Sequence, residues 1–356
     1  MTQKKARLRK FLLLLFVVSL LWVSGAPAED DPRDSNSPFG VLEFLIWDHS
    51  WNSYHYNSSA KLERAVKMMR QAGMSFVRMD FLWADVEPQA GKFNFGRYDR
   101  IVNILSKNGI KILGVLEYNP AWRPAPWNTA PDPALYEQYA RRVVDHFKDR
   151  VKYWEIWNEP DDKMYWAEQD EMKTYTALLK RVYPAIKEVD PTARVLMGGV
   201  SRSPYISLKN IYRQGGKDYF DIVNIHPYAD PLLPGAIKIV KGIYSSVHQV
   251  MVKYGDTDKK IWFTELGAPG VATPTRENCW WNGMSPTEEQ QAEWVRQIYN
   301  ECLKWEGVDK VFWAFFRDTH HFNSGIDYFG LVRNDFTPKP GYYVYQEMSK
   351  NYQTTK

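Results

Sequence analysis

Two glutamates in this chain stand at the ends of apolar, β-rich runs, where carboxyl groups could act as acid and nucleophile. Glu159 follows Asn158 directly after the run 151–157. Glu265 closes a second run, 260–265, just before a glycine-bearing loop. Cleavage of a glycosidic bond needs two carboxyl groups, because one protonates the leaving oxygen and the other meets the oxocarbenium-like centre. The two positions therefore predict a two-carboxylate active site.

Eight short β-rich runs alternate with helical patterns along the chain, and they must position these glutamates. The runs begin near Gly40, Phe76, Lys111, Tyr153, Ala193, Ile222, Lys260 and Asp309. Each interval fits one strand, one helix and their loops, which is typical of parallel strands joined by crossover helices. The pattern favours an α/β fold, a single-domain (β/α)8 TIM barrel, over an open doubly wound sheet, since no Gly-rich dinucleotide loop supports the open form.

Four stretches between the runs carry apolar residues at helical spacing. They are 59–72, 98–106, 133–147 and 286–305. Gly73 is the expected stop of the first helix, and Ser285 is the expected N-cap of the last.

In a closed barrel, the residues that act on substrate collect at the carboxyl ends of the strands and in the loops that follow. Eight side chains there are predicted to bind substrate: Arg78, Glu117, Asn119, Trp122, Asn158, His226, Tyr228 and Trp313. Arg78 and Tyr228 would orient Glu265. Glu117 could instead pair with Arg78, and His226 could instead be a satisfied core histidine. Glu155 shares the strand parity of Glu159 and is read as a deeper, hydrogen-bonded core acid.

The sequence around these positions resembles the clan A glycoside hydrolases. The motifs that carry the resemblance lie at 77–81, Trp83, 87–88, 153–161 and 264–267. Over 39–345 the chain is most similar to glycoside hydrolase family 39, with family 5 cellulase-like enzymes second. The resemblance implies that Glu159 is the acid/base after the fourth strand and Glu265 the nucleophile after the seventh. It also implies that Trp313 forms a platform under the sugar at the cleavage point.

The chemistry of this pair predicts double displacement with retention. Glu159 must keep a proton near neutral pH, whereas Glu265 must be ionised to form a covalent glycosyl-enzyme. Retention requires the two carboxyls at roughly 5 to 5.5 Å. Asn158 would donate to the sugar 2-hydroxyl. The expected substrate is a β-linked oligosaccharide or polysaccharide, and the alternatives are a transglycosylase of the same fold or a non-catalytic polysaccharide-binding protein in exopolysaccharide assembly.

Further side chains extend the predicted site without fixing the sugar. Six loop tryptophans could stack on sugars or pack the loops: Trp83, Trp122, Trp127, Trp166, Trp280 and Trp281. Arg123, Arg202 and Arg317 are candidates for a clamp on a hexuronic acid carboxylate. The adjacent His320 and His321 cannot easily share one face, so no metal is predicted. No cofactor is expected, because two carboxylates and water suffice for the reaction.

The start of the chain predicts export. Residues 1–28 combine a basic start, an apolar stretch and a small-residue cleavage site, as in a secretory signal peptide, and a retained membrane anchor is the alternative. Removing them takes away five positive charges and no negative ones, so the formal net charge falls from +4 to −1. The mature chain therefore gives no reason to expect binding to nucleic acid or to an anionic membrane.

The mature protein is predicted to be secreted or periplasmic and monomeric. It consists of a flexible segment at 29–37 and the catalytic barrel at 38–356. Its cysteines, Cys279 and Cys302, either pair in an oxidising compartment or are two separate buried thiols.

Overall fold

The computed structural model describes residues 37–276, 280–281 and 283–354. Eight strands within these residues run parallel and close into a barrel in chain order. They are β1 (Phe39–Leu42), β2 (Phe76–Leu82), β3 (Lys111–Glu117), β4 (Tyr153–Ile156), β5 (Arg194–Met197), β6 (Ile222–Ile225), β7 (Lys260–Leu266) and β8 (Val308–Ala314). The predicted (β/α)8 TIM barrel is confirmed, with every strand beginning within one residue of its expected start.

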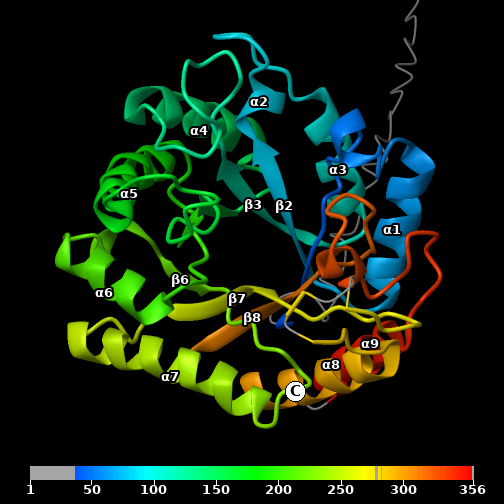
Figure 1. The fold of residues 1–356 in the computed structure, drawn as a ribbon. Coiled ribbons are helices and arrows are strands. Elements are labelled where there is room, and N and C mark those ends of the chain that lie inside the picture. The colour runs from blue at the N-terminus through cyan, green and yellow to red at the C-terminus, as the bar shows by residue number, and fades with distance from the viewer. Residues whose placement is uncertain (1–36, 277–279, 282, 355–356) are drawn as a thin grey trace, which may run out of the picture. The chain divides into compact units, whose positions relative to one another are not determined.

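Helices surround the strands as an outer ring (Figure 1). The helices of the described residues are α1 (Ser59–Gln71), α2 (Trp83–Val86), α3 (Gly96–Lys107), α4 (Pro133–Phe147), α5 (Glu171–Val189), α6 (Pro204–Arg213), α7 (Ala236–Tyr254), α8 (Glu288–Cys302) and α9 (Pro340–Thr354). Three short 3-10 turns accompany them: η1 (Ser50–Asn52), η2 (Lys217–Tyr219) and η3 (Gly325–Tyr328).

The helix ends follow from local capping. The expected stop at Gly73 is confirmed, because this glycine follows α1 with a φ of 77°, a conformation that costs it little. The expected cap of the eighth helix at Ser285 is wrong. Thr287 caps α8 instead, because its hydroxyl accepts from the backbone of Gln290 while the Gln290 side chain reaches back to Thr287.

Large apolar side chains fill the amino-terminal half of the barrel interior. The cluster consists of Phe76, Leu113, Leu196, Ile222, Trp262 and Phe312. The Phe76 and Trp262 rings meet edge to face at 5.4 Å. A Cβ on Gly40 would lie 2.6 Å from the Phe312 ring, so glycine makes room for it. At the next inward-facing position of the strands, two residues further along, the interior becomes polar. This polar layer holds the site described below.

Several predictions fall on residues outside those that the structure describes. The signal peptide at 1–28 lies there, as do all but the last residue of the 29–37 segment and Cys279. Cys302 is buried at the end of α8. Across the described part of the chain, the helices are too short or too polar to span a membrane.

Candidate active site

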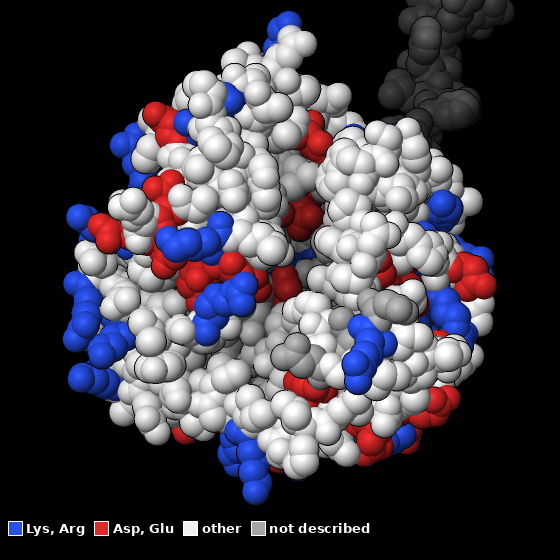
Figure 2. Space-filling model, viewed as in Figure 1, with Lys and Arg blue, Asp and Glu red and all other residues white. Residues whose placement is uncertain are grey.

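A cleft of about 630 Å³ opens at the carboxyl ends of the strands. Figure 2 shows the face hollowed near its middle, with acidic side chains inside the hollow. The charged and amide side chains that line the cleft are Arg78, Asp80, Glu117, Asn119, Asn158 and Glu265. Five of these six were predicted as site residues. The remaining predicted residues are located below relative to this cleft.

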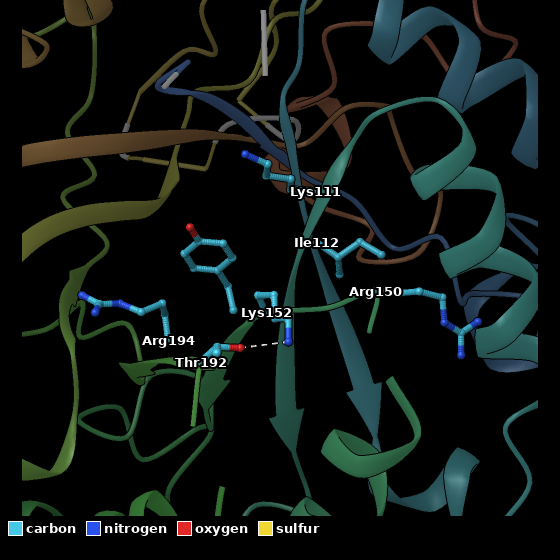
Figure 3. A pocket seen from close by; sticks show the side chains of 7 residues that line it. Lys111, Ile112, Arg150, Lys152, Thr192 and Arg194 are labelled. Carbon is cyan, nitrogen blue, oxygen red and sulfur yellow. Dashed lines mark hydrogen bonds between the residues drawn. The ribbon is translucent and has the colours of Figure 1, made fainter. Parts of the chain in front are cut away.

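A second cavity, of about 500 Å³, lies at the opposite ends of the strands (Figure 3). Its lining is basic, with Lys111, Arg150, Lys152 and Arg194 among its residues, and it includes no carboxylate. Lys152 donates to Thr192 at 2.9 Å and is paired with an aspartate, while the side chains of Arg150 and Arg194 extend in opposite directions. This cavity therefore lacks the two carboxyl groups that cleavage of a glycosidic bond requires.

Glu159 is held by a strained turn after β4. Trp157 and Glu159 have φ values of 67° and 42°, in the left-handed region that residues with a Cβ rarely adopt. Such positions cost about 1–3 kcal/mol each and persist where surrounding contacts enforce them. Asp161 supplies such contacts, because its carboxylate accepts from the backbone N–H groups of Ser201 and Ser203 at 3.0 and 3.2 Å. The turn is thereby tied to the loop before α6.

Glu265 enters the cleft because β7 carries an irregularity. Trp262 points into the barrel, so strict alternation would turn Glu265 outward. Between Phe263 and Leu266, however, β7 has one more residue than the facing stretch of β8. A bulge of this kind resets the alternation and re-aims the following side chain. Glu265 consequently joins the cleft lining, with 15% of its side chain exposed.

Arg78 connects the acids of the site. It is 2% exposed, and its Nε and Nη2 donate to the two oxygens of Glu155 at 2.7 and 2.9 Å. Nη1 donates to Glu265 at 2.7 Å, and Nη2 also donates to Asn158 Oδ1 at 2.8 Å. The fully buried Glu155 further accepts from Gly199 N–H at 3.0 Å, which confirms its reading as a core acid. Arg78 thus fixes both a catalytic candidate and its neighbouring amide.

His226 and Tyr228, from the end of β6, complete the contacts of the two glutamates. Tyr228 donates its hydroxyl to Glu265 Oε2 at 2.8 Å. His226 Nδ1 lies 2.7 Å from Glu159 Oε1 and 3.7 Å from Glu265 Oε2. On the other side of the ring, Nε2 lies 3.0 Å from the hydroxyl of Thr264. Because that hydroxyl donates to Asn224, it accepts from Nε2–H, and Nδ1 is left to exchange a proton with Glu159.

The two catalytic candidates lie close together and are tuned in opposite directions. A carboxylate oxygen of Glu159 and one of Glu265 lie within 4.8 Å of one another. Burial raises the pKa of Glu159 above its ordinary value, and the hydrogen bond and charge of His226 offset this only in part. Burial would also raise the pKa of Glu265, but the charges of His226 and Arg78 and the donors around it hold that pKa below its ordinary value. This environment favours the protonated form of Glu159 and the charged form of Glu265, as an acid/base and a nucleophile require.

Glu159, His226 and Glu265 also form the one set of potential metal ligands found in the described part of the chain. The guanidinium of Arg78, 2.7 Å from Glu265, already supplies positive charge at this point. The chemistry assigned to the two carboxyls requires no metal ion.

Four predicted substrate-binding residues are absent from the described cleft lining: Trp122, His226, Tyr228 and Trp313. His226 and Tyr228 contact the two glutamates, whereas Trp313 and Trp122 pack elsewhere. Trp313 is fully buried in the cluster between barrel and helices, and its Nε1 donates to the Phe329 carbonyl at 2.9 Å. The predicted platform is therefore wrong, because alternation along β8 turns Trp313 away from the interior, and Phe315 lines the cleft instead. Trp122 packs edge-on against Trp83 and donates to a backbone carbonyl, so it supports a loop.

Asn119 and Glu117 line the cleft as expected, but their polar atoms are engaged differently. The Asn119 amide braces its own loop, donating to the carbonyls of Pro126 and Thr129 at 3.0 and 2.7 Å. Glu117 is hydrogen-bonded to Asp80, a pairing that the sequence did not suggest. Substrate binding by either residue stays a prediction.

Two groups of apolar side chains, most of them absent from the predicted site, flank the acids. One comes from the loops after β1 and β8 and comprises Phe44, Trp47, Trp51 and Phe322. The other comes from the loops after β3 and β4 and comprises Tyr118, Trp127, Met164 and Tyr165. Only Trp127 belongs to the six predicted loop tryptophans. The rule that points to strand ends would have found Trp47 and Trp51 had it been applied to the loop after the first strand.

Known families and proteins resemble this chain at the level of both sequence and fold. The family described as Cellulase (glycosyl hydrolase family 5) matches residues 39–316. Endo-1,4-beta-xylanase B of Thermotoga neapolitana is 23% identical over 288 residues, which cover 75% of this chain and 77% of that protein. Endo-1,4-beta-xylanase A of Phanerodontia chrysosporium is 28% identical over 142 residues, so that 38% of this chain matches 33% of that protein.

Solved structures share the barrel. A family 39 glycoside hydrolase from Bacteroides cellulosilyticus WH2 superposes with a TM-score of 0.70 at 24% identity, covering 90% of this chain and 65% of that one. A monomeric beta-xylosidase from Caulobacter crescentus CB15 gives a TM-score of 0.66 at 17% identity, covering 89% of this chain and 69% of that one. At these identities the likeness concerns the fold.

Proposed function

Because this chain belongs to the cellulase family of glycosyl hydrolases, family 5, we propose that it hydrolyses a β-linked oligosaccharide or polysaccharide with retention at the anomeric carbon. The observation that carries the proposal is the pair of carboxylate oxygens within 4.8 Å, on residues whose pKa values are shifted apart. Retaining pairs lie roughly 5 to 5.5 Å apart, whereas inverting pairs need roughly 6.5 to 9.5 Å to admit water.

In the first step, Glu265 attacks the anomeric carbon while Glu159 gives its proton to the departing glycosidic oxygen. A bond forms between Glu265 and carbon 1, and the bond to the leaving sugar breaks. Arg78 and Tyr228 hold Glu265 in place through its two oxygens. As Glu159 becomes charged, its partner His226 stabilises that charge at 2.7 Å.

In the second step, Glu159 takes a proton from water, and the water oxygen attacks carbon 1 from the face that the leaving sugar vacated. The bond to Glu265 breaks, so the product keeps the configuration of the substrate. Asn158 assists both steps in this proposal. Its Oδ1 accepts from Arg78, which can only donate, so Nδ2 is the donor end of the amide. One Nδ2 hydrogen faces the Tyr118 hydroxyl at 3.4 Å, and in this proposal the other donates to the sugar 2-hydroxyl.

The flanking aromatic side chains support an extended substrate. Trp51 and Trp127 come from the two different groups, and they are 54% and 49% exposed, so their faces are available to the C–H surfaces of sugars. Rings on both sides of the acids would bind units on both sides of the cleaved bond.

The proposal is tested by incubating the mature protein with β-linked glucans, xylans and mannans and reading the anomeric configuration of fresh products by NMR. The expected product is the β-anomer, and Glu265→Ala abolishes its release. Fresh α-anomer, or turnover that survives the substitution, would remove Glu265 from the nucleophile role. The same product analysis separates hydrolysis from transfer to a second sugar.

Azide rescue then separates the roles of the two glutamates. With an activated aryl β-glycoside, Glu265→Ala plus azide should yield the α-glycosyl azide, because azide attacks carbon 1 directly. Glu159→Ala plus azide should yield the β-glycosyl azide, because azide intercepts the glycosyl-enzyme. Identical products from both variants would contradict the assignment.

The proposal places this activity outside the cytoplasm, on a monomer. The basic and apolar start of the chain supports export, and one structural relative is called monomeric. Amino-terminal sequencing of the exported protein should begin at Glu29, and light scattering should give the mass of a single chain.

A further inference from the structure

A pair of carboxyl groups stands beside the catalytic residues without a role in the two steps above. Asp80 lies on the inward face of β2, two residues before its end, and Glu117 ends β3, where its strand neighbour in register is Leu82. The two side chains are hydrogen-bonded to each other. Both line the cleft, Asp80 half-buried and Glu117 only 2% exposed.

Two carboxyl groups that hydrogen-bond to one another must share a proton, because a carboxylate can only accept. Burial raises the pKa of Asp80 to about 6, and burial together with the charge of Asp80 raises the pKa of Glu117 well above its usual value. The charged and titratable groups that interact with the pair are Arg78, Glu155, Glu265, Tyr98, Tyr118, Tyr136, Tyr139 and Tyr165. Because the shared proton lies between the two carboxyls, the pair offers its remaining carboxyl oxygens to a ligand as hydrogen-bond acceptors.

The same cleft gives a sugar carboxylate little to bind. Arg78 is the one lysine or arginine among its described lining residues, and it is already bonded to two glutamates and an asparagine. His321 is the one histidine there. A uronic acid placed near the catalytic pair would thus meet carboxyl groups rather than cations.

The arginines considered for a carboxylate clamp lie elsewhere. Arg123 donates to Asn119 and Arg202 to Asp162. Arg317 is 2% exposed and donates to the His55 carbonyl at 3.1 Å. None of the three belongs to the described cleft lining, so they do not converge on a substrate.

We propose that Asp80 and Glu117, joined by a shared proton, bind the hydroxyl groups of an uncharged sugar beside the catalytic pair and exclude a uronic acid from that position. This inference rests on the proposed function. The remaining oxygens of the two carboxyls accept from two sugar hydroxyls, which suits a neutral diol. A carboxylate there is repelled by Asp80 and Glu265, and the nearby Arg78 already pairs with Glu155 and Glu265.

The test measures binding to the inactive variant Glu159→Gln by calorimetry. The probes are tetramers of β-1,4-linked glucose, xylose and mannose, and, as the charged counterpart, the tetramer of β-1,4-linked glucuronic acid. At least one neutral tetramer should bind more tightly than the glucuronic acid tetramer. Adding Asp80→Asn or Glu117→Gln should weaken binding of the neutral tetramer about 10- to 100-fold, the usual effect of losing a charge-assisted hydrogen bond. Either substitution should also reduce the difference in affinity between the neutral tetramer and the glucuronic acid tetramer.

Glu293→Gln is the matched control, because it removes one exposed carboxylate from α8, away from the cleft, and should change neither affinity. Glucuronic acid binding that equals or exceeds neutral binding would overturn the inference, as would unchanged affinities in both pair variants or no binding of any tetramer.

Hydrolysis by the wild type is measured on the same tetramers. Cleavage of the glucuronic acid tetramer would leave the proposed function standing and overturn this inference. Binding of a neutral tetramer without cleavage of any tetramer would leave this inference standing and overturn the proposed function.

Discussion

The same strands build both halves of the barrel interior, but from opposite kinds of side chain. The lower half lies at the amino-terminal ends of the strands and is apolar, and the upper half lies at their carboxyl ends and is polar. In the lower half, Phe76, Trp262 and Phe312 pack ring against ring. Two residues after Phe76 on the same face of β2, Arg78 enters a layer of glutamates. The difference separates two tasks, because burial of apolar surface stabilises a fold, whereas burial of ion pairs roughly cancels its own desolvation cost.

The buried charges of the upper half are therefore explained by the chemistry they serve rather than by a contribution to stability. Its ions hold Glu159 and Glu265 at different pKa values, and its strained turn at Glu159 is imposed by neighbouring contacts. If this division holds, substitutions in the two halves should affect activity and stability separately.

The largest expected effect is on activity alone. Glu265→Gln removes the nucleophile but keeps the shape of the side chain, so kcat should fall by roughly 10⁴-fold or more. The melting temperature should stay the same or rise, since one fewer charge is held in a buried layer and Arg78 keeps its contacts to Glu155. Steady-state kinetics and calorimetric unfolding measure the two quantities. A large drop in melting temperature would show that the upper half also stabilises the fold.

The opposite result is expected in the lower half. Phe312→Ala leaves a cavity among Phe76, Trp262 and Gly40, and should lower the free energy of unfolding by about 3–5 kcal/mol. The kcat of the remaining folded protein should be unchanged at a temperature well below the transition. Phe312→Leu is the milder control, and denaturant titration measures both. A loss of kcat in the folded Phe312→Ala protein would break the division between the halves.

The sequence predicted the positions of the strands better than it predicted which side chains at their ends face the cleft. The strand starts follow from a repeated local pattern, and the glycosidase class follows from the two glutamate motifs and the family resemblance; both are confirmed. Whether a strand side chain faces the cleft depends on the alternation of inward and outward residues, and an irregularity in the strand shifts that alternation. The extra residue in β7 turns Glu265 inward, although its carboxylate was assigned to the site from position alone. At Trp313 the same assignment failed, because regular alternation turns that ring outward.

Contacts between side chains of neighbouring strands could not be predicted from local sequence patterns. The hydrogen bond between Asp80 and Glu117 joins two strand ends that are far apart in sequence, and it depends on the register of β2 and β3. Thr264 was missed for a similar reason, because a threonine inside a strand gives no signal until its partner His226 is known.

A residue at the boundary should show both effects at intermediate size. Glu155 is fully buried beneath the cleft and bonds Arg78 through both oxygens. Glu155→Gln leaves one of those N–H donors poorly matched, and should cost about 1.5–3 kcal/mol of unfolding free energy. Because Arg78 then holds Glu265 less firmly, kcat should also fall, and by far less than in Glu265→Gln. Unfolding free energy and kcat, measured on one preparation, test this. A change in unfolding free energy alone would assign Glu155 to the lower half, and a change in kcat alone would assign it to the upper half.

The smallest expected effect is a shift in the pH dependence of kcat/KM, which reports the pKa values of the two acids in the upper half. Activity needs Glu265 ionised and Glu159 protonated, so kcat/KM should fall below the depressed pKa of Glu265 and above the raised pKa of Glu159. His226 lowers the pKa of both acids through its charge, and for Glu159 also through a hydrogen bond. His226→Asn removes that charge, so both pKa values should rise and both limbs of the profile should move to higher pH. His248→Asn on α7, remote from the cleft, is the matched control and should leave the profile in place. Limbs that stay fixed in His226→Asn, or that move in opposite directions, would mean that Arg78 and Tyr228 set the two acids without the histidine.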